Sequence, residues 1–209
     1  MRGAFGPGST PLHLLAQGDS ITRGLWWKSV LPLFLAVPGM ALAEAPPARP
    51  AQIVLFRHAD KPDDRDDPHL SPEGVARAAL LVPFITTDPL MTRYGAPAAL
   101  YATGTTKHDD GQRTQETVAP LARELKLPVQ TPFLGKRPAE LARHILGSPA
   151  LAGKTVIICW NHEHIPELAA ALGVDPPPRR WKGKVYDRVY VITYPDGKAS
   201  LSETHYGGK

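Results

Sequence analysis

The sequence predicts an α/β fold: a single domain of three layers, with helices on both sides of a mostly parallel sheet, over residues 51–209. Two observations support this prediction. The segments Gln52–Arg57 and Lys154–Trp160 are nearly continuous apolar runs of strand length, as expected for strands that are buried on both faces. Segments predicted to be helical alternate with such strands along the chain, which is the order of a parallel sheet with crossover helices.

The predicted elements are joined by short polar connections. In chain order they are strand 52–57, helix 71–84, strand 99–102, helix 112–126, helix 139–146, strand 154–160, helix 165–172, and the strands 187–194 and 199–205. The last two strands flank the turn sequence Pro195-Asp196-Gly197, so we expect them to form a hairpin or an edge pair.

Local signals mark the ends of two helices and the nature of one loop. Ser71 suits the N-cap of the first helix, and Pro72 suits its first position. Gly173 follows the helix that begins at Ile165, and glycine is common at a helix C-terminus. The aspartate-rich loop 60–70 lacks the ordered alternation, the glycine and the final glutamate of an EF-hand. We therefore expect a solvated loop at the mouth of a pocket instead of a calcium site.

Residues 1–43 do not resemble part of a folded domain. Arg23 and Lys28 precede an apolar stretch, Ser29–Ala43, that ends in the small-x-small pattern Ala-Leu-Ala. This combination is typical of a secretory signal, and the stretch is shorter than the roughly 20 apolar residues of a membrane span. We expect a signal peptide or N-terminal extension in 1–43, a proline-rich leader in 44–50, and a bacterial protein that is periplasmic or secreted, without a stable membrane span.

Charge and cysteine content narrow the possible partners. The net charge of the chain is +4, and residues 1–43 carry three basic side chains against one acidic, which leaves +2 for the rest. Its lysines and arginines are scattered and do not form a stripe, so we expect no nucleic-acid partner. The single cysteine, Cys159, lies in a predicted buried strand, which excludes an intrachain disulfide and indicates a small core residue. The oligomeric state is left open.

The first strand ends in a pair of residues that suits phosphate chemistry. Arg57 and His58 directly follow the apolar run, and ligands of open α/β sheets gather at the carboxyl ends of the strands. An imidazole can act as a nucleophile, and a guanidinium offers planar paired donors that match phosphate oxygens. An Arg-His pair alone is weak evidence, because such a pair is usually only a solvated strand end.

Two further motifs lie in the expected order along the chain. Arg113 lies in the segment Gln112-Arg-Thr-Gln-Glu-Thr117, and His162 with Glu163 follows the second buried strand. Together with Arg57-His58-Ala59 and the helix start Leu70-Ser-Pro-Glu-Gly74, they resemble the histidine phosphatase superfamily, also called phosphoglycerate-mutase-like. The resemblance covers about residues 51–194 and implies a phosphoglycerate-mutase-like fold. The stretch before Arg113 is about six residues longer than is usual in that family.

The resemblance implies a role for each of these residues. His58 would attack the phosphorus atom and become phosphohistidine, while Arg57, Arg113 and His162 would surround the phosphate oxygens. Water would then release phosphate. The arginines would supply the positive charge, so no metal and no cofactor are expected.

The proton donor is the least defined part of the predicted site. In the acid-phosphatase branch of the family the donor directly follows the second histidine, and Glu163 occupies that position. Burial would favour the protonated form of this carboxyl group and so suit it to the role. Glu116 and Asp60 are alternatives, although either could instead orient an arginine.

Lysines and a second histidine lie close to these motifs. Lys61 and Lys107 are candidate substrate-binding residues, and His108 could also reach the pocket rim. His164 is expected at the rim or at a helix start. His162, Glu163 and His164 could also be interpreted as zinc ligands, but the neighbouring arginines would repel a cation.

Other functions remain as alternatives. The segment Gln17–Gly24 resembles the nucleophile block of GDSL-type serine hydrolases, but no strong strand precedes Ser20, no convincing Asp-x-x-His follows, and the block would be discarded on export. A non-catalytic phosphate- or anion-binding module and a phosphomutase would use the same pocket. We favour a phosphomonoester hydrolase that acts on a small phosphomonoester or on a phosphorylated envelope molecule.

Overall fold

In the computed structural model, which describes residues 49–64, 66–107 and 111–207, six strands form one sheet in the order β3-β2-β4-β1-β5-β6. The strands are β1 (Gln52–Arg57), β2 (Pro97–Ala102), β3 (Val129–Gln130), β4 (Thr155–Trp160), β5 (Arg188–Thr193) and β6 (Ser200–His205). The pairs β1–β4, β2–β4 and β2–β3 are parallel, whereas β5 is antiparallel to both β1 and β6. The predicted mostly parallel sheet and the terminal hairpin are confirmed.

The two central strands explain the apolar runs of the sequence. Every residue of β1 and β4 is buried, and side chains alternate between the two faces of the sheet. Ile53 and Leu55 pack on one face, whereas Val54 and Phe56 pack on the other. Because both faces face a core, neither strand shows the polar alternation of a half-exposed strand.

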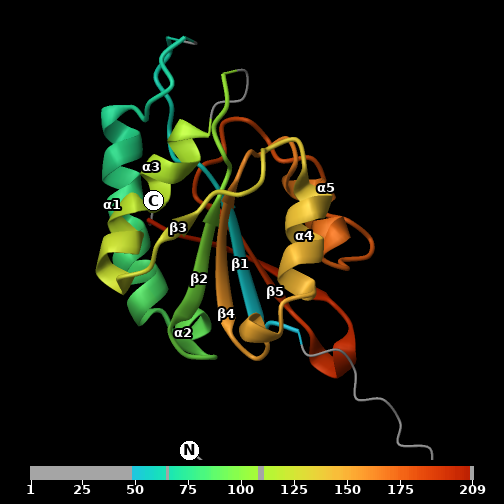
Figure 1. The fold of residues 1–209 in the computed structure, drawn as a ribbon. Helices are drawn as coiled ribbons and strands as arrows, with labels where there is room; N and C mark the ends of the chain where they lie inside the picture. The colour runs from blue at the N-terminus through green and yellow to red at the C-terminus, as the bar shows by residue number, and fades with distance from the viewer. Residues whose placement is uncertain (1–48, 65, 108–110, 208–209) are drawn as a thin grey trace, which may run out of the picture. The chain divides into compact units, whose positions relative to one another are not determined.

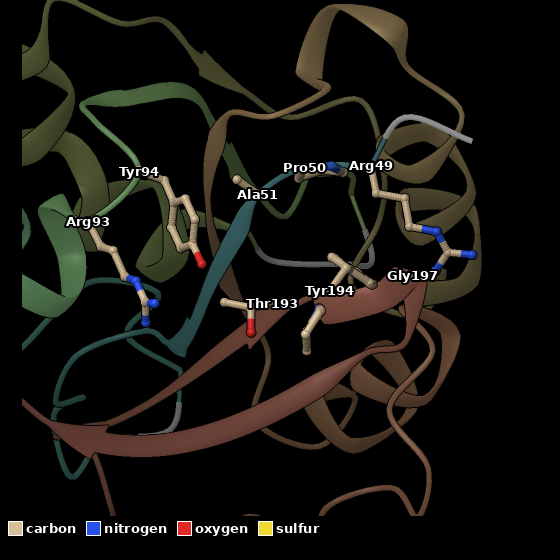
Figure 2. A pocket seen from close by; sticks show the side chains of 9 residues that line it. Arg49, Pro50, Ala51, Arg93, Tyr94, Thr193, Tyr194 and Gly197 are labelled. Carbon is tan, nitrogen blue, oxygen red and sulfur yellow. The ribbon is translucent and has the colours of Figure 1, made fainter. Parts of the chain in front are cut away.

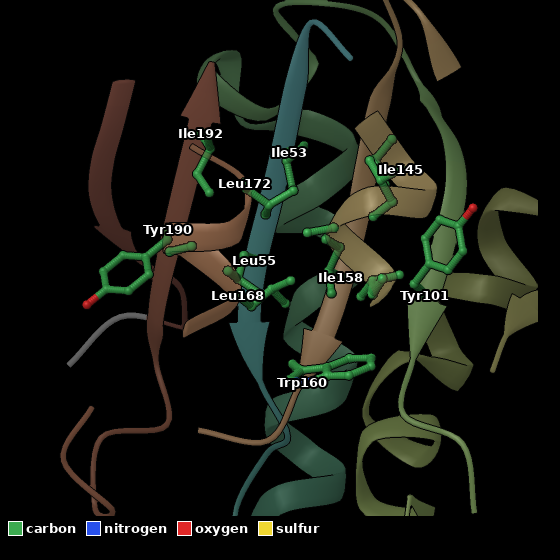
Figure 3. Close-up of a cluster of buried hydrophobic side chains, with 14 of the residues drawn as sticks. Ile53, Leu55, Tyr101, Ile145, Ile158, Trp160, Leu168, Leu172, Tyr190 and Ile192 are labelled. Atoms are coloured by element: carbon green, nitrogen blue, oxygen red, sulfur yellow. The ribbon is translucent and has the colours of Figure 1, made fainter. Parts of the chain in front are cut away.

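Helices cover both faces, which gives the predicted three layers (Figure 1). α1 (Pro72–Thr87) and α3 (Gln112–Leu125) lie on one side, and α4 (Pro138–Leu146) and α5 (Ile165–Ala171) lie on the other. Figure 3 shows the core on the side of α4 and α5, in which leucines of the α5 segment pack against isoleucines and Trp160 of the sheet. Cys159 is a buried free thiol in the core on the side of α1 and α3, as expected.

The start of α1 is fixed by a close contact that the sequence signals only in part. The Ser71 hydroxyl accepts a hydrogen bond from the backbone N–H of Gly74 (3.1 Å), which confirms the predicted N-cap. A Cβ atom at Gly74 would lie 2.2 Å from the carbonyl oxygen of Asp60, so the position requires glycine. α1 therefore starts directly beside the segment that follows His58.

Some boundaries differ from the predicted ones. α1 continues to Thr87 instead of ending near Phe84, because buried Ile85 extends its apolar face. Several elements of two to four residues are too short to leave a periodic pattern, and the sequence does not predict them. They are α2 (Pro89–Thr92), β3 and the 3₁₀ turn Pro149–Leu151, whereas the 3₁₀ turn Pro195–Gly197 lies where the sequence predicts the turn between β5 and β6.

The predicted signal segment, 1–43, and most of the leader lie outside the described residues, as does Ser20. Export, cleavage and the domain boundaries stay predictions. In the part of the chain that the structure describes, no helix combines the length and the apolar character that a bilayer crossing requires.

Candidate active site

The carboxyl ends of β1 and β4 place the predicted site residues together. The two strands are parallel neighbours, and Arg57 is the register partner of Trp160, so His58 and His162 leave the sheet side by side. A cavity of about 400 Å³ lies at this edge. It is lined by Arg57, His58, Lys61, Arg113, Thr114, Asn161, His162, Glu163 and Gly183.

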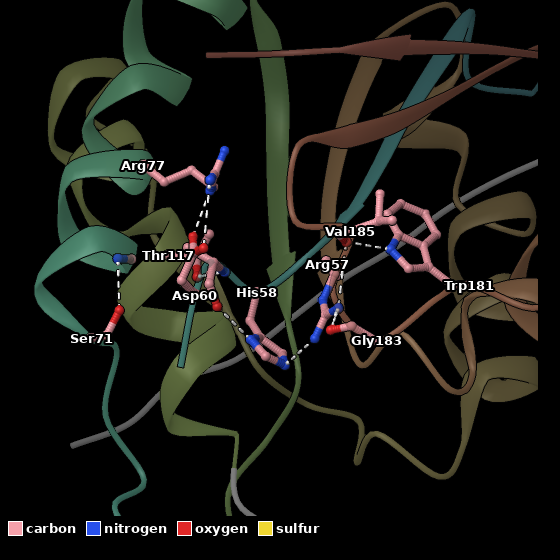
Figure 4. Close-up of polar contacts among 11 residues, drawn as sticks. Arg57, His58, Asp60, Ser71, Arg77, Thr117, Trp181, Gly183 and Val185 are labelled. Atoms are coloured by element: carbon pink, nitrogen blue, oxygen red, sulfur yellow. Dashed lines mark hydrogen bonds and ion pairs between the residues drawn. The ribbon is translucent and has the colours of Figure 1, made fainter. Parts of the chain in front are cut away.

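His58 is held in one tautomer by its own backbone neighbour. Its Nδ1 lies 2.7 Å from the carbonyl oxygen of Ala59, and because a carbonyl only accepts, Nδ1 carries the proton (Figure 4). Nε2 therefore carries the lone pair of the ring, and it lies next to the guanidinium group of Arg57. Burial, together with the positive charge of Arg57, lowers the pKa of His58 to about 3. The imidazole is therefore neutral at physiological pH, as a nucleophile must be.

Arg57 is a buried arginine that is held by backbone carbonyl groups. Its side chain is 1% exposed, and Nη1 donates to the carbonyl oxygen of Gly183 (2.7 Å) and more weakly to that of Val185 (3.4 Å). Nη2 donates to Nε2 of His58 at 3.3 Å (Figure 4). Burial lowers the pKa of Arg57, and nearby Tyr186, Cys159 and Asp60 oppose this effect. The guanidinium therefore points one of its donors at Nε2 of His58, the candidate nucleophile.

Arg113 reaches the same cavity from the first turn of α3. Its guanidinium donates through Nε to the carbonyl oxygen of His69 (3.1 Å) and through Nη2 to that of Asp67, so it also fixes the aspartate-rich loop. Arg113 lines the cavity although the stretch before α3 is long. Gly111 packs so closely against the backbone of Thr103 that a Cβ atom would lie 2.3 Å from its carbonyl oxygen.

His162 faces His58 across the cavity. The centroids of the two rings are 6.3 Å apart, and burial with the charge of Arg57 lowers the pKa of His162 to about 4. His164 instead begins α5, where its Nδ1 lies 3.5 Å from the carboxylate of Glu167. Among the described residues no three His, Cys, Asp or Glu side chains are grouped to hold a metal ion.

The three candidate proton donors have different surroundings. Glu163 lines the cavity, but its side chain is exposed, so the expected burial is wrong. Asp60 pairs with Arg77 at 2.5 Å. Although burial raises the pKa of Glu116, hydrogen bonds from His69, Gln112 and the backbone of Leu70 outweigh it and lower the pKa. Of the three carboxyl groups, only that of Glu163 lines the cavity.

The two predicted lysines also differ. Lys61 lines the cavity, whereas Lys107 is exposed and does not line it. His108, the other residue considered for the rim, lies outside the described residues.

Sequence reasoning missed three residues of the cavity wall. Asn161 lies between Trp160 and His162, and its place at a strand end was a usable signal. Thr114 follows Arg113, and its hydroxyl donates to the carbonyl oxygen of Gly111 (2.8 Å). Gly183 comes from a connection without any motif, so no local signal pointed to it.

A second cavity, of about 480 Å³, lies at the other end of β1 (Figure 2). Its walls include Arg49, Arg93, Tyr94 and Tyr194, and it contains none of the predicted site residues. It offers two guanidinium groups but no histidine in its wall, so it holds no candidate imidazole nucleophile.

Solved structures share this architecture. A structure of the protein histidine phosphatase SixA with tungstate superposes with a TM-score of 0.51 at 15% sequence identity, over 74% of this chain and 96% of that one. The chain has the fold of the histidine phosphatases. A phosphoserine phosphatase from Entamoeba histolytica, in complex with 3-phosphoglyceric acid, gives a TM-score of 0.50 at 13% identity, over 76% and 97% of the two chains. By sequence, no protein-family model and no curated protein matches the chain.

Proposed function

We propose that the protein is a metal-independent phosphomonoester hydrolase that works through a phosphohistidine at His58. The geometry of His58 carries this proposal. Its Nδ1–H is committed to the carbonyl oxygen of Ala59, and its neutral Nε2 stands beside Arg57 in a cavity that Arg113 also lines. A neutral nucleophile next to fixed cations is what attack on a phosphate dianion requires.

The reaction would proceed in two displacements. When phosphate enters, Nη2 of Arg57 exchanges its hydrogen bond to Nε2 of His58 for one to a phosphate oxygen. The freed Nε2 lone pair forms a bond to phosphorus while the ester P–O bond breaks, and Glu163 donates a proton to the leaving oxygen. Water then attacks the phosphorus atom, its proton passes to Glu163, and the P–N bond breaks to release phosphate. Arg57 and Arg113 stabilise the charge on the equatorial oxygens in both steps.

The fold supports this proposal, because two of the solved structures that share it carry phosphatase names. The substrate would be a small phosphomonoester or an exposed phosphate on a larger envelope molecule, since the predicted signal would place the enzyme in the periplasm or outside the cell.

Turnover of p-nitrophenyl phosphate by wild type and His58→Gln tests the proposal. We expect the variant to lose all measurable turnover, while His205→Gln, which changes an exposed histidine of β6, keeps it. Mass spectrometry after a quench without acid should find phosphate on His58 of the wild type. Turnover by His58→Gln would refute the covalent step, and phosphate binding without any turnover in the wild type would favour the binding module.

A further inference from the structure

We propose that Tyr186 is a positioning residue, which holds the plane of the Arg57 guanidinium for phosphate binding. The proposal rests on the function proposed above and adds a residue from a segment that carries no motif. Three sets of contacts support it: those on the face of the guanidinium, those along its edge, and those that anchor the Tyr186 segment.

The face of the guanidinium is covered by the tyrosine ring. The Cζ atom of Arg57 lies 4.0 Å from the ring centroid of Tyr186, well within the range of a cation–π interaction. Such an interaction strengthens when water is excluded, and Arg57 is 1% exposed. The same ring lies 6.1 Å from that of His58, so it stands beside both the arginine and the nucleophile.

The edge of the guanidinium is held by the segment that carries the tyrosine. Nη1 of Arg57 donates to the carbonyl oxygens of Gly183 and Val185, three positions and one position before Tyr186. Edge contacts alone leave the guanidinium plane free to tilt. Contact with the ring face removes that freedom.

The segment itself is anchored in the core. The indole N–H of Trp181, which is 1% exposed, donates to the carbonyl oxygen of Val185 at 2.8 Å (Figure 4). The ring of Trp181 packs against Tyr190 of β5 with a centroid distance of 5.0 Å. These contacts hold the turn that precedes Tyr186 in place. The ring of Tyr186 therefore has a fixed position against the guanidinium of Arg57.

Loss of the ring should open the guanidinium to water. Tyr186 also lines an adjoining cavity of about 450 Å³, which shares Lys61 and Gly183 with the cavity that contains His58. Without the ring this adjoining cavity would reach the face of Arg57. The arginine would keep its charge but lose its fixed orientation, so the transition state should suffer more than substrate binding.

Two substitutions separate the ring from the hydroxyl group. We expect Tyr186→Leu to lower kcat for p-nitrophenyl phosphate about 10-fold with little change in KM, and to weaken tungstate binding about 10-fold by calorimetry. Tyr186→Phe should stay within about 3-fold of the wild type in both measurements. Tyr94→Leu, which removes a tyrosine from the second cavity, is the matched control and should change neither.

A double-mutant cycle shows whether Tyr186 acts through Arg57. In an Arg57→Lys background, the effect of Tyr186→Leu should shrink to less than about 2-fold. The proposal would be overturned by an undiminished effect in that background, or by wild-type kcat and tungstate affinity in Tyr186→Leu. Equal losses in Tyr186→Phe and Tyr186→Leu would overturn it as well. If Tyr186→Leu melts below the assay temperature, Tyr186→Met takes its place. A wild type without turnover would refute the proposed function, while tungstate binding would still test Tyr186.

Discussion

At the scale of single residues, burial and neighbouring charge hold both cavity histidines in their neutral forms. The pKa of His58 is lowered to about 3 and that of His162 to about 4, in both cases by burial first and by the charge of Arg57 second. Arg57 thus has two effects. In the proposed reaction it would bind the phosphate, and its charge also keeps a proton off the atom that would attack.

The lowered pKa of His58 predicts that acid destabilises the protein. The ordinary pKa of 6.5 applies to the unfolded chain, so between pH 6.5 and about 3 the unfolded state binds a proton at His58 that the folded state does not. Stability is therefore complete above pH 6.5 and falls as the pH decreases. Between pH 7.5 and 5 this linkage amounts to about 2 kcal/mol.

Urea unfolding of wild type and His58→Gln at both pH values measures this effect. We expect the wild type to lose about 2 kcal/mol more unfolding free energy than the variant on acidification. Equal losses in the two proteins would show that the fold does not hold His58 neutral.

Glu163 gives a second prediction at this scale. Glu163→Gln should slow hydrolysis of alkyl phosphates by about 10²–10⁴-fold but affect p-nitrophenyl phosphate least, because an activated phenol leaves without a proton. Rates for a series of esters with increasing leaving-group pKa would test this. Equal losses across the series would mean that Glu163 only orients His162.

At the scale of elements, Thr117 of α3 connects the helix to the end of β1. Its hydroxyl accepts from the backbone N–H of Ala59 (2.8 Å) and donates to the carbonyl oxygen of Arg113 (2.7 Å). The carbonyl group of the same Ala59 fixes the tautomer of His58. One threonine therefore links the end of the strand next to His58 to the helix that carries Arg113.

Replacement of this hydroxyl should be costly. Thr117→Val keeps the shape of the side chain but leaves the buried N–H of Ala59 without a partner, which should lower the free energy of unfolding by about 1–3 kcal/mol. Thr87→Val removes an exposed hydroxyl at the end of α1 that bonds within its own helix, and should cost less than about 0.5 kcal/mol. Similar losses in the two variants, measured by urea denaturation, would contradict the proposed bridge.

At the scale of the whole molecule, the positive charge of the cavity is assembled from separate parts of the chain. Arg57 comes from β1, Arg113 from α3, and Lys61 from the loop after β1. The sheet order brings these parts together, because β1 and β4 are neighbours and α3 packs on the same core face as α1.

This arrangement predicts that metal chelation leaves catalysis intact. With the phosphate charge balanced by arginines, EDTA should not change kcat/KM for p-nitrophenyl phosphate. A loss of activity that zinc or magnesium restores would overturn this prediction and would favour a metal site that includes His162 and Glu163.

The sequence by itself determined the features that have a local pattern. Apolar runs buried on both faces identified β1 and β4. Arg57 at the end of β1, His58 directly after it and His162 two positions after β4 lie together at the carboxyl ends of these strands, as the sequence predicts. The serine cap of α1 was equally readable, because a cap depends on neighbours within one turn.

Only the tertiary structure decided which distant groups meet at the site. The carbonyl that holds Arg57 belongs to Gly183, 126 positions away, and the ring over it belongs to Tyr186. The partner of Asp60 and the exposure of Glu163 were likewise not readable. Periodicity and caps report interactions within a few residues, whereas the place where a connection crosses the sheet edge depends on how all the layers pack.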